Sequence, residues 1–289
     1  MSVAVLGPGG VGGFLAGALA RAGEDVVVVA REETAGRIAH DGLRIESARL
    51  GSFTARPRTA TELDHEVDVL IVATKAPALD DALARVKVQP AMLVPLLNGF
   101  EHLPHLRAVF PGTIAGSIRI AAERVAPGHV VQTSAFLRVE LAGRGADRLA
   151  HVLRAAEIPT KVLDSDAAVL WGKLVRLCAL ALSTSAAGAP IGPVLTHPRR
   201  RLLLEGAVDE ATAIAHEEGA RVDAGTVLEE LASLDPAQTS SLARDLAAGN
   251  PSELDAIGGA VMRAGARHGI ATPSIDALVA EIGRRYPPR

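Results

Sequence analysis

Six residues near the start of the chain have the composition and spacing of a phosphate-binding turn. Residues 7–12 are Gly-Pro-Gly-Gly-Val-Gly, a G-x-G-x-x-G pattern between a short apolar run and a helical pattern. Glycines in this pattern permit a tight turn, close approach of the backbone to a pyrophosphate, and close packing of helix against strand. The free N–H groups of the helix N-terminus then face the phosphates. The residues expected to hold a dinucleotide are Gly7, Gly9, Gly10, Val11 and Gly12.

The residue after the second expected strand distinguishes NAD from NADP. An acidic residue there accepts from the ribose 2′-hydroxyl, whereas an arginine accommodates a 2′-phosphate. Arg31 stands at this point, directly after Ala30, and predicts a preference for NADP(H). Two alternatives stay open. Glu32 or Glu33 would favour NAD by folding back, and Arg31 would have no role as a solvated loop residue.

Hydrophobic patterning predicts the elements that position this turn. In the first half, short apolar runs alternate with helical patterns, which is typical of βαβ units and a parallel sheet. The expected strands are Val3–Leu6, Asp25–Ala30, Val67–Ala73, Met92–Leu96 and Ile114–Ile118, with a helix over Gly12–Ala22 that ends at Gly23. Residues 130–163 are expected at the far edge of the sheet, where Arg138–Leu141 alternates as a half-exposed strand does.

From about Ser165 the strand patterns stop and helical periodicity dominates. The expected helices are Asp166–Ser185, Arg200–Glu218, Ala224–Ala232, one containing Asp255–His268, and Ser274–Arg284 with Ser274 as its N-cap. We therefore predict an α/β fold: an N-terminal Rossmann domain over residues 1–165, which binds the dinucleotide, and an all-α C-terminal domain over residues 166–289.

Composition narrows the class of protein further. The 289 residues are 48% hydrophobic, which suits two domains that each bury a core. Aromatic residues make up 2% and the formal charge is −3, so no nucleic-acid partner is expected. Cys178 is the single cysteine and no basic leader precedes the first apolar run, which together favour the cytoplasm. Lys173 and Arg176 interrupt the longest apolar tract, so we expect a buried helix and no membrane span.

Several short motifs, in this order, resemble the ketopantoate reductase family over essentially the whole chain. They are the N-terminal GPGGVGG, Arg31, Ala73–Ala76 (ATKA), Leu97–Gly99 (LNG), Leu170–Leu174 (LWGKL), Ser240–Asp245 (SSLARD) and Glu253–Asp255 (ELD). The resemblance implies reduction of the 2-keto acid 2-dehydropantoate (ketopantoate) to the 2-hydroxy acid by hydride from NADPH. It also implies a cleft between the two domains, with substrate and catalytic groups on the helical one.

By this resemblance, Lys173 takes the place of the general acid. Hydride arriving at a ketone carbon leaves charge on the oxygen, which an ammonium group can stabilise and protonate. The apolar surroundings of Lys173 would desolvate the ammonium group and lower its pKa. The alternative is that the stem of Lys173 packs while its ammonium group reaches solvent.

The resemblance implies four further site residues. Asn98 orients substrate and nicotinamide, unless it belongs to a plain Asn-Gly turn. Lys75 lies near cofactor and substrate, unless it is a solvated loop charge. Ser241 and Glu253 bind the hydroxyl and carboxylate end of the substrate, and Glu253 also counts among the catalytic residues. Alternatively, Glu253 belongs to a helix start with Ser252 as N-cap.

One departure from the family leaves the substrate open. The family usually has asparagines four and eight residues after the catalytic lysine, and this chain has Leu177 and Ala181. Both share the helix face of Lys173, so two polar contacts are apolar here. Arg176 is either a substitute carboxylate partner or a surface residue. The hypotheses are a ketopantoate or related 2-keto acid reductase, a reductase of a bulkier, more apolar ketone or imine, and a non-catalytic NADP(H) sensor.

The remaining candidates carry no catalytic prediction. His102 and His105 form an H-x-x-H pattern in a proline-containing segment expected to be a loop, and no metal is expected there. Cys178 lies in an apolar helix and is expected to be an inert, buried thiol. The apolar pattern of Ala207–Ala215 fits either a homodimer face on the helical domain or its core.

Overall fold

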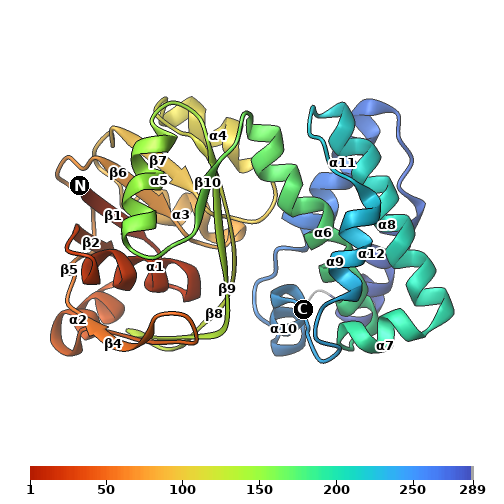
Figure 1. Cartoon of the computed structure of the whole chain (residues 1–289), viewed down its shortest axis with the longest axis horizontal. Helices are drawn as coiled ribbons and strands as arrows, with labels where there is room; N and C mark the ends of the chain where they lie inside the picture. Colours follow the sequence, from red (N-terminus) through yellow and green to blue (C-terminus); the bar gives the residue numbers. More distant parts are fainter. Residues whose placement is uncertain (288–289) are drawn as a thin grey trace. The chain divides into compact units, whose positions relative to one another are not determined.

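A computed structural model of the chain describes residues 1–287, which form two compact units (Figure 1). Unit 1 contains Met1–Leu97 and His102–Val169. Unit 2 contains Asn98–Glu101 and the residues from Leu170 onward. Four residues in the first half of the chain therefore belong to the helical unit. Whether residues 1–165 and 166–289 fold as separate domains stays a prediction.

The first sheet of unit 1 is parallel and buried on both faces. Its order is β5-β2-β1-β6-β7, from β1 (Ser2–Leu6), β2 (Asp25–Val29), β5 (Arg58–Ala60), β6 (Val69–Val72) and β7 (Met92–Pro95). Val3 and Val5 of β1 belong to one apolar cluster, and Ala4 and Leu6 to another. Continuous apolar runs are typical of such doubly covered strands, and the predicted parallel sheet is confirmed for four of its five predicted strands. The prediction for Ile114–Ile118 is wrong, because the strand Ala115–Ala126 pairs in a second sheet.

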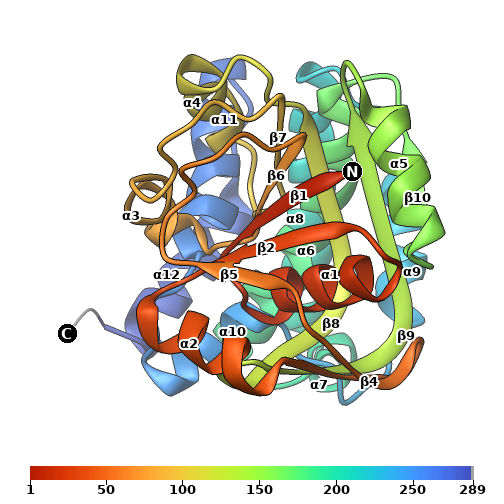
Figure 2. The same ribbon diagram turned by 90° about the vertical axis from the view of Figure 1, so that its left-hand side faces the viewer.

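Helices cover both faces of this sheet. They are α1 (Gly10–Arg21), α2 (Glu32–Asp41), the 3-10 turn η1 (Ala76–Ala78), α3 (Leu79–Leu83), α4 (His102–Val109) and α5 (Ala146–Ala155). Figure 2 shows α1 running along β1 and β2. Phe14 and Leu15 of α1 join the cluster that contains Val3, whereas Leu106 of α4 joins the cluster that contains Leu6. The glycine-rich residues therefore connect a central strand to a covering helix.

A second sheet in unit 1 contradicts the prediction for residues 130–163. It has the order β10-β9-β3-β4, with β8 also paired to β9, from β3 (Leu43–Ser47), β4 (Gly51–Ala55), β8 (Ala115–Ala126), β9 (His129–Ala142) and β10 (Thr160–Val162). Strand β9 bonds three neighbours, so it is not the edge of the first sheet. Residues 138–141 are also not half-exposed, because Glu140 is only 5% exposed and lies 2.8 Å from Arg138 Nε. An ion pair allows the buried face of a sheet to carry charged side chains. The alternation of charged and apolar residues at 138–141 therefore did not indicate exposure to solvent.

Unit 2 is all-helical, as expected. Its elements are α6 (Asp166–Ala187, whose first four residues belong to unit 1), α7 (Ile191–Thr196), α8 (Pro198–Glu217), α9 (Ala224–Ala232), α10 (Ser241–Ala248), the π-helical turn η2 (Asp255–Gly259), α11 (Ala260–His268) and α12 (Pro273–Arg285). Among residues 1–287, α6 is the one helix long and apolar enough to cross a membrane, and 67% of its most apolar stretch is buried within the protein. Such burial is typical of a core helix. Ala207, Ala211 and Ile214 of α8 are also buried, so their pattern serves the core.

Three local predictions in unit 2 differ from the structure. Short α7 and α10 were not predicted. Ser274 is not the N-cap of α12, because Thr272 is the N-cap and Pro273 is the first helical residue, the position that proline favours. Ser252 is not an N-cap either. The helical backbone begins at Leu254, and the Glu253 carbonyl accepts from Ile257 N–H at 3.0 Å.

Candidate functional site

Steric contacts explain two glycines of the turn between β1 and α1, Gly7 and Gly12. Gly7 has φ +89°, and a β-carbon there would lie 2.8 Å from Thr74 Cγ2. A β-carbon on Gly12 would lie 2.2 Å from the Gly7 carbonyl oxygen, so helix and strand approach too closely for a side chain. Gly9 differs, because no atom lies within 4 Å of the corresponding point. A tight turn, an open side at Gly9 and the N-terminus of α1 together fit a pyrophosphate.

The end of β2 presents a cation beside this turn. Arg31 is exposed and is the N-cap residue of α2, and within residues 1–287 its guanidinium makes no hydrogen bond or ion pair. Glu32 and Glu33 are the first residues of α2, where negative charge interacts favourably with the helix dipole. The two acids thus have a structural role that does not require a ribose, whereas Arg31 is available to an anion.

Two of the predicted catalytic residues lie together in unit 2, although 155 positions separate them in the chain. Asn98 Nδ2 donates a hydrogen bond of 2.8 Å to Glu253 Oε2. Glu253 is only 8% exposed. A buried carboxylate needs hydrogen-bond donors, and the Asn98 amide is one of them. The contact fixes the orientation of the Asn98 amide group.

The residues after Asn98 bind the same unit. Gly99 has φ +84°, and a β-carbon there would lie 2.3 Å from the Ala256 carbonyl oxygen in η2. The Phe100 ring packs on Trp171 of α6, with centroids 4.9 Å apart and planes tilted by 34°. Asn98-Gly99 is therefore more than a plain turn, because its glycine permits close packing against the residues that follow Glu253.

Helix α6 carries the predicted general acid and the positions that depart from the family. Lys173 is half-buried, two residues after Trp171. Arg176 is 19% exposed with Nε 3.4 Å from Glu230 Oε2 of α9, so it has a carboxylate partner within the protein. Ala181 is fully buried, whereas Leu177 is half-buried. Of the two replacements, only Leu177 presents apolar surface outside the core.

The other predicted polar residues lie at helix starts. Ser241 is exposed as the first residue of α10. Its neighbour Ser240, which belongs to the same motif but was not predicted as an N-cap, is 4% exposed. Ser240 Oγ accepts from Ala243 N–H at 3.1 Å and lies 2.9 Å from Thr184 Oγ1. A serine before a helical pattern is the N-cap signal that identifies it. In unit 1, exposed Lys75 directly precedes η1.

The histidine pair and the cysteine lie outside this arrangement. His102 begins α4, so the expected loop is a helix, and His105 Nε2 lies 3.2 Å from Asp80 Oδ1. In the part of the chain that the structure describes, no three His, Cys, Asp or Glu residues are grouped as metal ligands. Cys178 is fully buried, and burial raises the pKa of its thiol to about 12. The protonated thiol is a poor nucleophile, as predicted.

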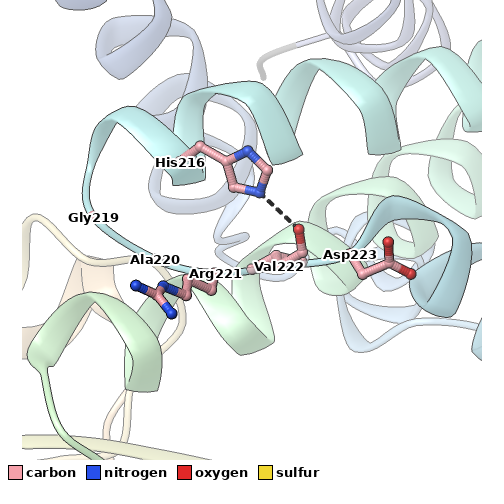
Figure 3. A pocket seen from close by; sticks show the side chains of 6 residues that line it. All are labelled: His216, Gly219, Ala220, Arg221, Val222 and Asp223. Atoms are coloured by element: carbon pink, nitrogen blue, oxygen red, sulfur yellow. Dashed lines mark hydrogen bonds between the residues drawn. The ribbon is translucent and has the colours of Figure 1, made fainter.

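A surface hollow of about 570 Å³ lies at the turn between α8 and α9 (Figure 3). It is lined by His216, Gly219, Ala220, Arg221, Val222 and Asp223. His216 Nε2 lies 2.7 Å from the Val222 carbonyl oxygen, and Asp223 accepts from Thr226 N–H as the N-cap of α9. No residue singled out by the sequence lines this hollow. Its polar groups serve the turn itself.

A parallel sheet with a glycine-rich turn, followed by a helical unit that contains the Asn98–Glu253 hydrogen bond, has the architecture of a dinucleotide-dependent oxidoreductase. The chain belongs to the ketopantoate reductase PanE/ApbA family: residues 3–142 match Ketopantoate reductase PanE/ApbA and residues 167–285 its C-terminal part. It is 33% identical to the 2-dehydropantoate 2-reductase of Caulobacter vibrioides, over 96% of this chain and 97% of that one. The predicted family and fold class are confirmed.

Two solved structures are similar over their whole length. A PanE/ApbA family ketopantoate reductase from Ralstonia eutropha JMP134 has a TM-score of 0.88 at 27% identity, covering 98% of this chain and 97% of the other. D-mandelate dehydrogenase with NADH and anilino(oxo)acetate has a TM-score of 0.88 at 21% identity, covering 99% and 98%. NADH is bound in that D-mandelate dehydrogenase structure, and the relative from Caulobacter vibrioides is named for reduction of a small keto acid, 2-dehydropantoate.

Proposed function

We propose that this chain reduces 2-dehydropantoate, or a related small 2-keto acid, to the 2-hydroxy acid with NADPH. The observation that carries the proposal is the hydrogen bond between Asn98 and buried Glu253. The resemblance to the family assigns both residues to the site, and a contact across 155 positions is not a product of local sequence. The cofactor would lie on the glycine-rich turn, with Arg31 at its 2′-phosphate and Lys75 and Asn98 near its nicotinamide.

The chemistry needs one hydride and one proton. The bound cofactor would supply the hydride to the keto carbon. Lys173 would then give its proton to the carbonyl oxygen and stabilise the charge that develops there. Asn98 would orient the reacting carbonyl, while Ser241 and Glu253 bind the hydroxyl and carboxylate end of the substrate.

The rate of NADPH oxidation with ketopantoate tests this proposal. Turnover should fall roughly a hundredfold or more in Lys173→Ala, because the general acid is lost. Lys87→Ala is the matched control, since exposed Lys87 forms a surface ion pair with Glu62 at 3.5 Å. Absence of turnover in a wild-type protein that still binds NADPH would contradict the assignment of ketopantoate. Equal turnover by both lysine variants would contradict the role of Lys173.

The preference for NADPH rests on the available guanidinium of Arg31. Arg31→Ala should lower kcat/KM for NADPH by about tenfold and leave the value for NADH nearly unchanged, because only NADPH carries the 2′-phosphate. Steady-state kinetics with each cofactor measure the ratio. Comparable kcat/KM for NADH and NADPH in the wild-type protein would contradict the preference.

A second candidate substrate is a bulkier, more apolar 2-keto acid. Half-buried Leu177, one helical turn after Lys173, favours it, since the family usually has a polar residue there. Structural similarity to D-mandelate dehydrogenase suggests phenylglyoxylate as the probe. Leu177→Asn should then shift kcat/KM toward ketopantoate. NADPH binding without turnover on any ketone or imine would leave the sensor hypothesis.

The proposed setting is the cytoplasm, with no membrane or nucleic-acid partner, and a homodimer through the helical domain. Leu202 of α8, a large apolar side chain that is 68% exposed, is the position at which the dimer can be tested. Light scattering at micromolar concentration should give twice the mass of one chain. Leu202→Glu should shift the protein toward the monomer.

A further inference from the structure

Arg263 of α11 binds two carboxylates that lie close in sequence to Asn98 and Glu253. Its Nε and Nη2 donate to Glu101 Oε1 and Oε2 at 3.0 and 2.6 Å. Its Nη1 and Nη2 donate to Asp255 Oδ1 and Oδ2 at 2.8 and 3.1 Å. Glu101 follows Asn98 by three residues, and Asp255 follows Glu253 by two. One guanidinium therefore ties together the two chain segments that carry the hydrogen-bonded pair.

The Arg263 contacts orient the two carboxylates but contribute little to stability. Arg263, Glu101 and Asp255 are 46%, 38% and 82% exposed, and exposed ion pairs contribute little to overall stability. The arginine fork is planar and rigid, so two bidentate contacts fix the directions of both carboxylates. The hydrogen bonds that Arg263 donates hold the pKa of Asp255 below its usual range, and acceptance of these bonds by Glu101 and Asp255 raises the pKa of Arg263. Arg263 and Asp255 therefore stay charged around neutral pH.

We infer that Arg263 is a positioning residue of the catalytic site: it holds Asn98 and Glu253 in their hydrogen-bonded arrangement through Glu101 and Asp255. The inference rests on the proposed function, since it assigns Arg263 to the same site. Arg267, one turn further along α11, adds a second anchor. Its guanidinium carbon lies 5.8 Å from the centroid of the Phe100 ring, and its Nη2 donates to Glu218 at 3.0 Å. Residues 98–101 are thus anchored by α11 at two points.

Kinetics with combined variants separate positioning from general stability. In the wild-type background, Arg263→Ala and Glu101→Gln should each lower kcat/KM roughly tenfold. In the Asn98→Ala background, the same substitutions should lower kcat/KM by less than about twofold, because the effects of residues that act through a shared partner are not additive. Arg201→Ala, which removes the exposed pair with Glu205 in the same unit, is the matched control and should have no effect. An equal loss with and without Asn98 would overturn the inference.

The single tryptophan gives a measurement that needs no substrate. Trp171 is 2% exposed and packs on Phe100 of the anchored residues. Release of residues 98–101 in Arg263→Ala should shift its emission to longer wavelength and raise its quenching by acrylamide, with Tm nearly unchanged. Unchanged Trp171 accessibility would overturn the inference. A wild-type protein that reduces no keto acid would contradict the proposed function instead, and a change at Trp171 would still establish that Arg263 holds the Asn98 segment.

Discussion

The two candidate binding regions are built in opposite ways. The turn of residues 7–12 in unit 1 is contiguous in sequence, and it works through main-chain geometry and the absence of side chains. The Asn98–Glu253 arrangement in unit 2 consists of side chains brought together from distant positions. The first can be altered by adding a methyl group and the second by removing a polar group. This difference gives each region its own mutational test.

The largest expected effect is on the side-chain region. Asn98→Ala should lower kcat/KM by about a hundredfold, roughly 2.7 kcal/mol, because the amide no longer orients the substrate or bonds to Glu253. Steady-state kinetics measure this loss. Exposed Asn250, the other asparagine of the chain, provides the control Asn250→Ala. Similar activities of the two variants would remove Asn98 from the site.

The next effect concerns the close packing of the backbone region. Gly12→Ala places a β-carbon 2.2 Å from the Gly7 carbonyl oxygen, so helix and strand must separate. We expect a loss of about 1–3 kcal/mol in the free energy of unfolding, as in other overpacked cores. Urea unfolding measures it. A variant as stable as the wild-type protein would mean that α1 can move without cost.

A smaller effect is expected for Gly9→Ala, which tests cofactor binding by the turn separately from its packing. Gly9 has φ −74° and open space around its absent side chain, so Gly9→Ala should leave stability unchanged. The added methyl group would stand where a pyrophosphate approaches the backbone, and the Kd for NADPH should rise about tenfold. Calorimetric titration measures the Kd. Unaltered binding would exclude Gly9 from the cofactor site.

The smallest effect is the control for both glycine variants. Gly36 lies inside α2 without a positive φ, and no atom lies within 4 Å of the point that a β-carbon would occupy. Gly36→Ala should raise stability by about 0.5–1 kcal/mol, because alanine loses less backbone entropy in a helix. Cofactor affinity should stay the same. A destabilised variant would show that glycine in this unit is sensitive for reasons other than contact.

The difference between contiguous residues and residues brought together from distant positions also explains what the sequence could predict. Val69–Val72 and Ala224–Ala232 were recognisable because an apolar run and a helical period are local signals. The second sheet was missed because β3 carries Arg44 and Glu46 and because Glu140 is buried beside a partner. Asn98 and Glu253 were found only through resemblance to a family. The Arg263–Glu101 pair spans 162 positions, and no periodicity indicates which charges meet.

The membership of residues 98–101 in unit 2 has a consequence for how the protein is made. Synthesis proceeds from the N-terminus at about 5–20 residues per second, so Glu253 leaves the ribosome roughly 8–30 s after Asn98. During that interval Asn98 has no Glu253 to bond, although Trp171, the packing partner of Phe100, has already been synthesised. The Asn–Glu pair is therefore completed late, and a chain interrupted before Glu253 would contain the glycine-rich turn without this pair.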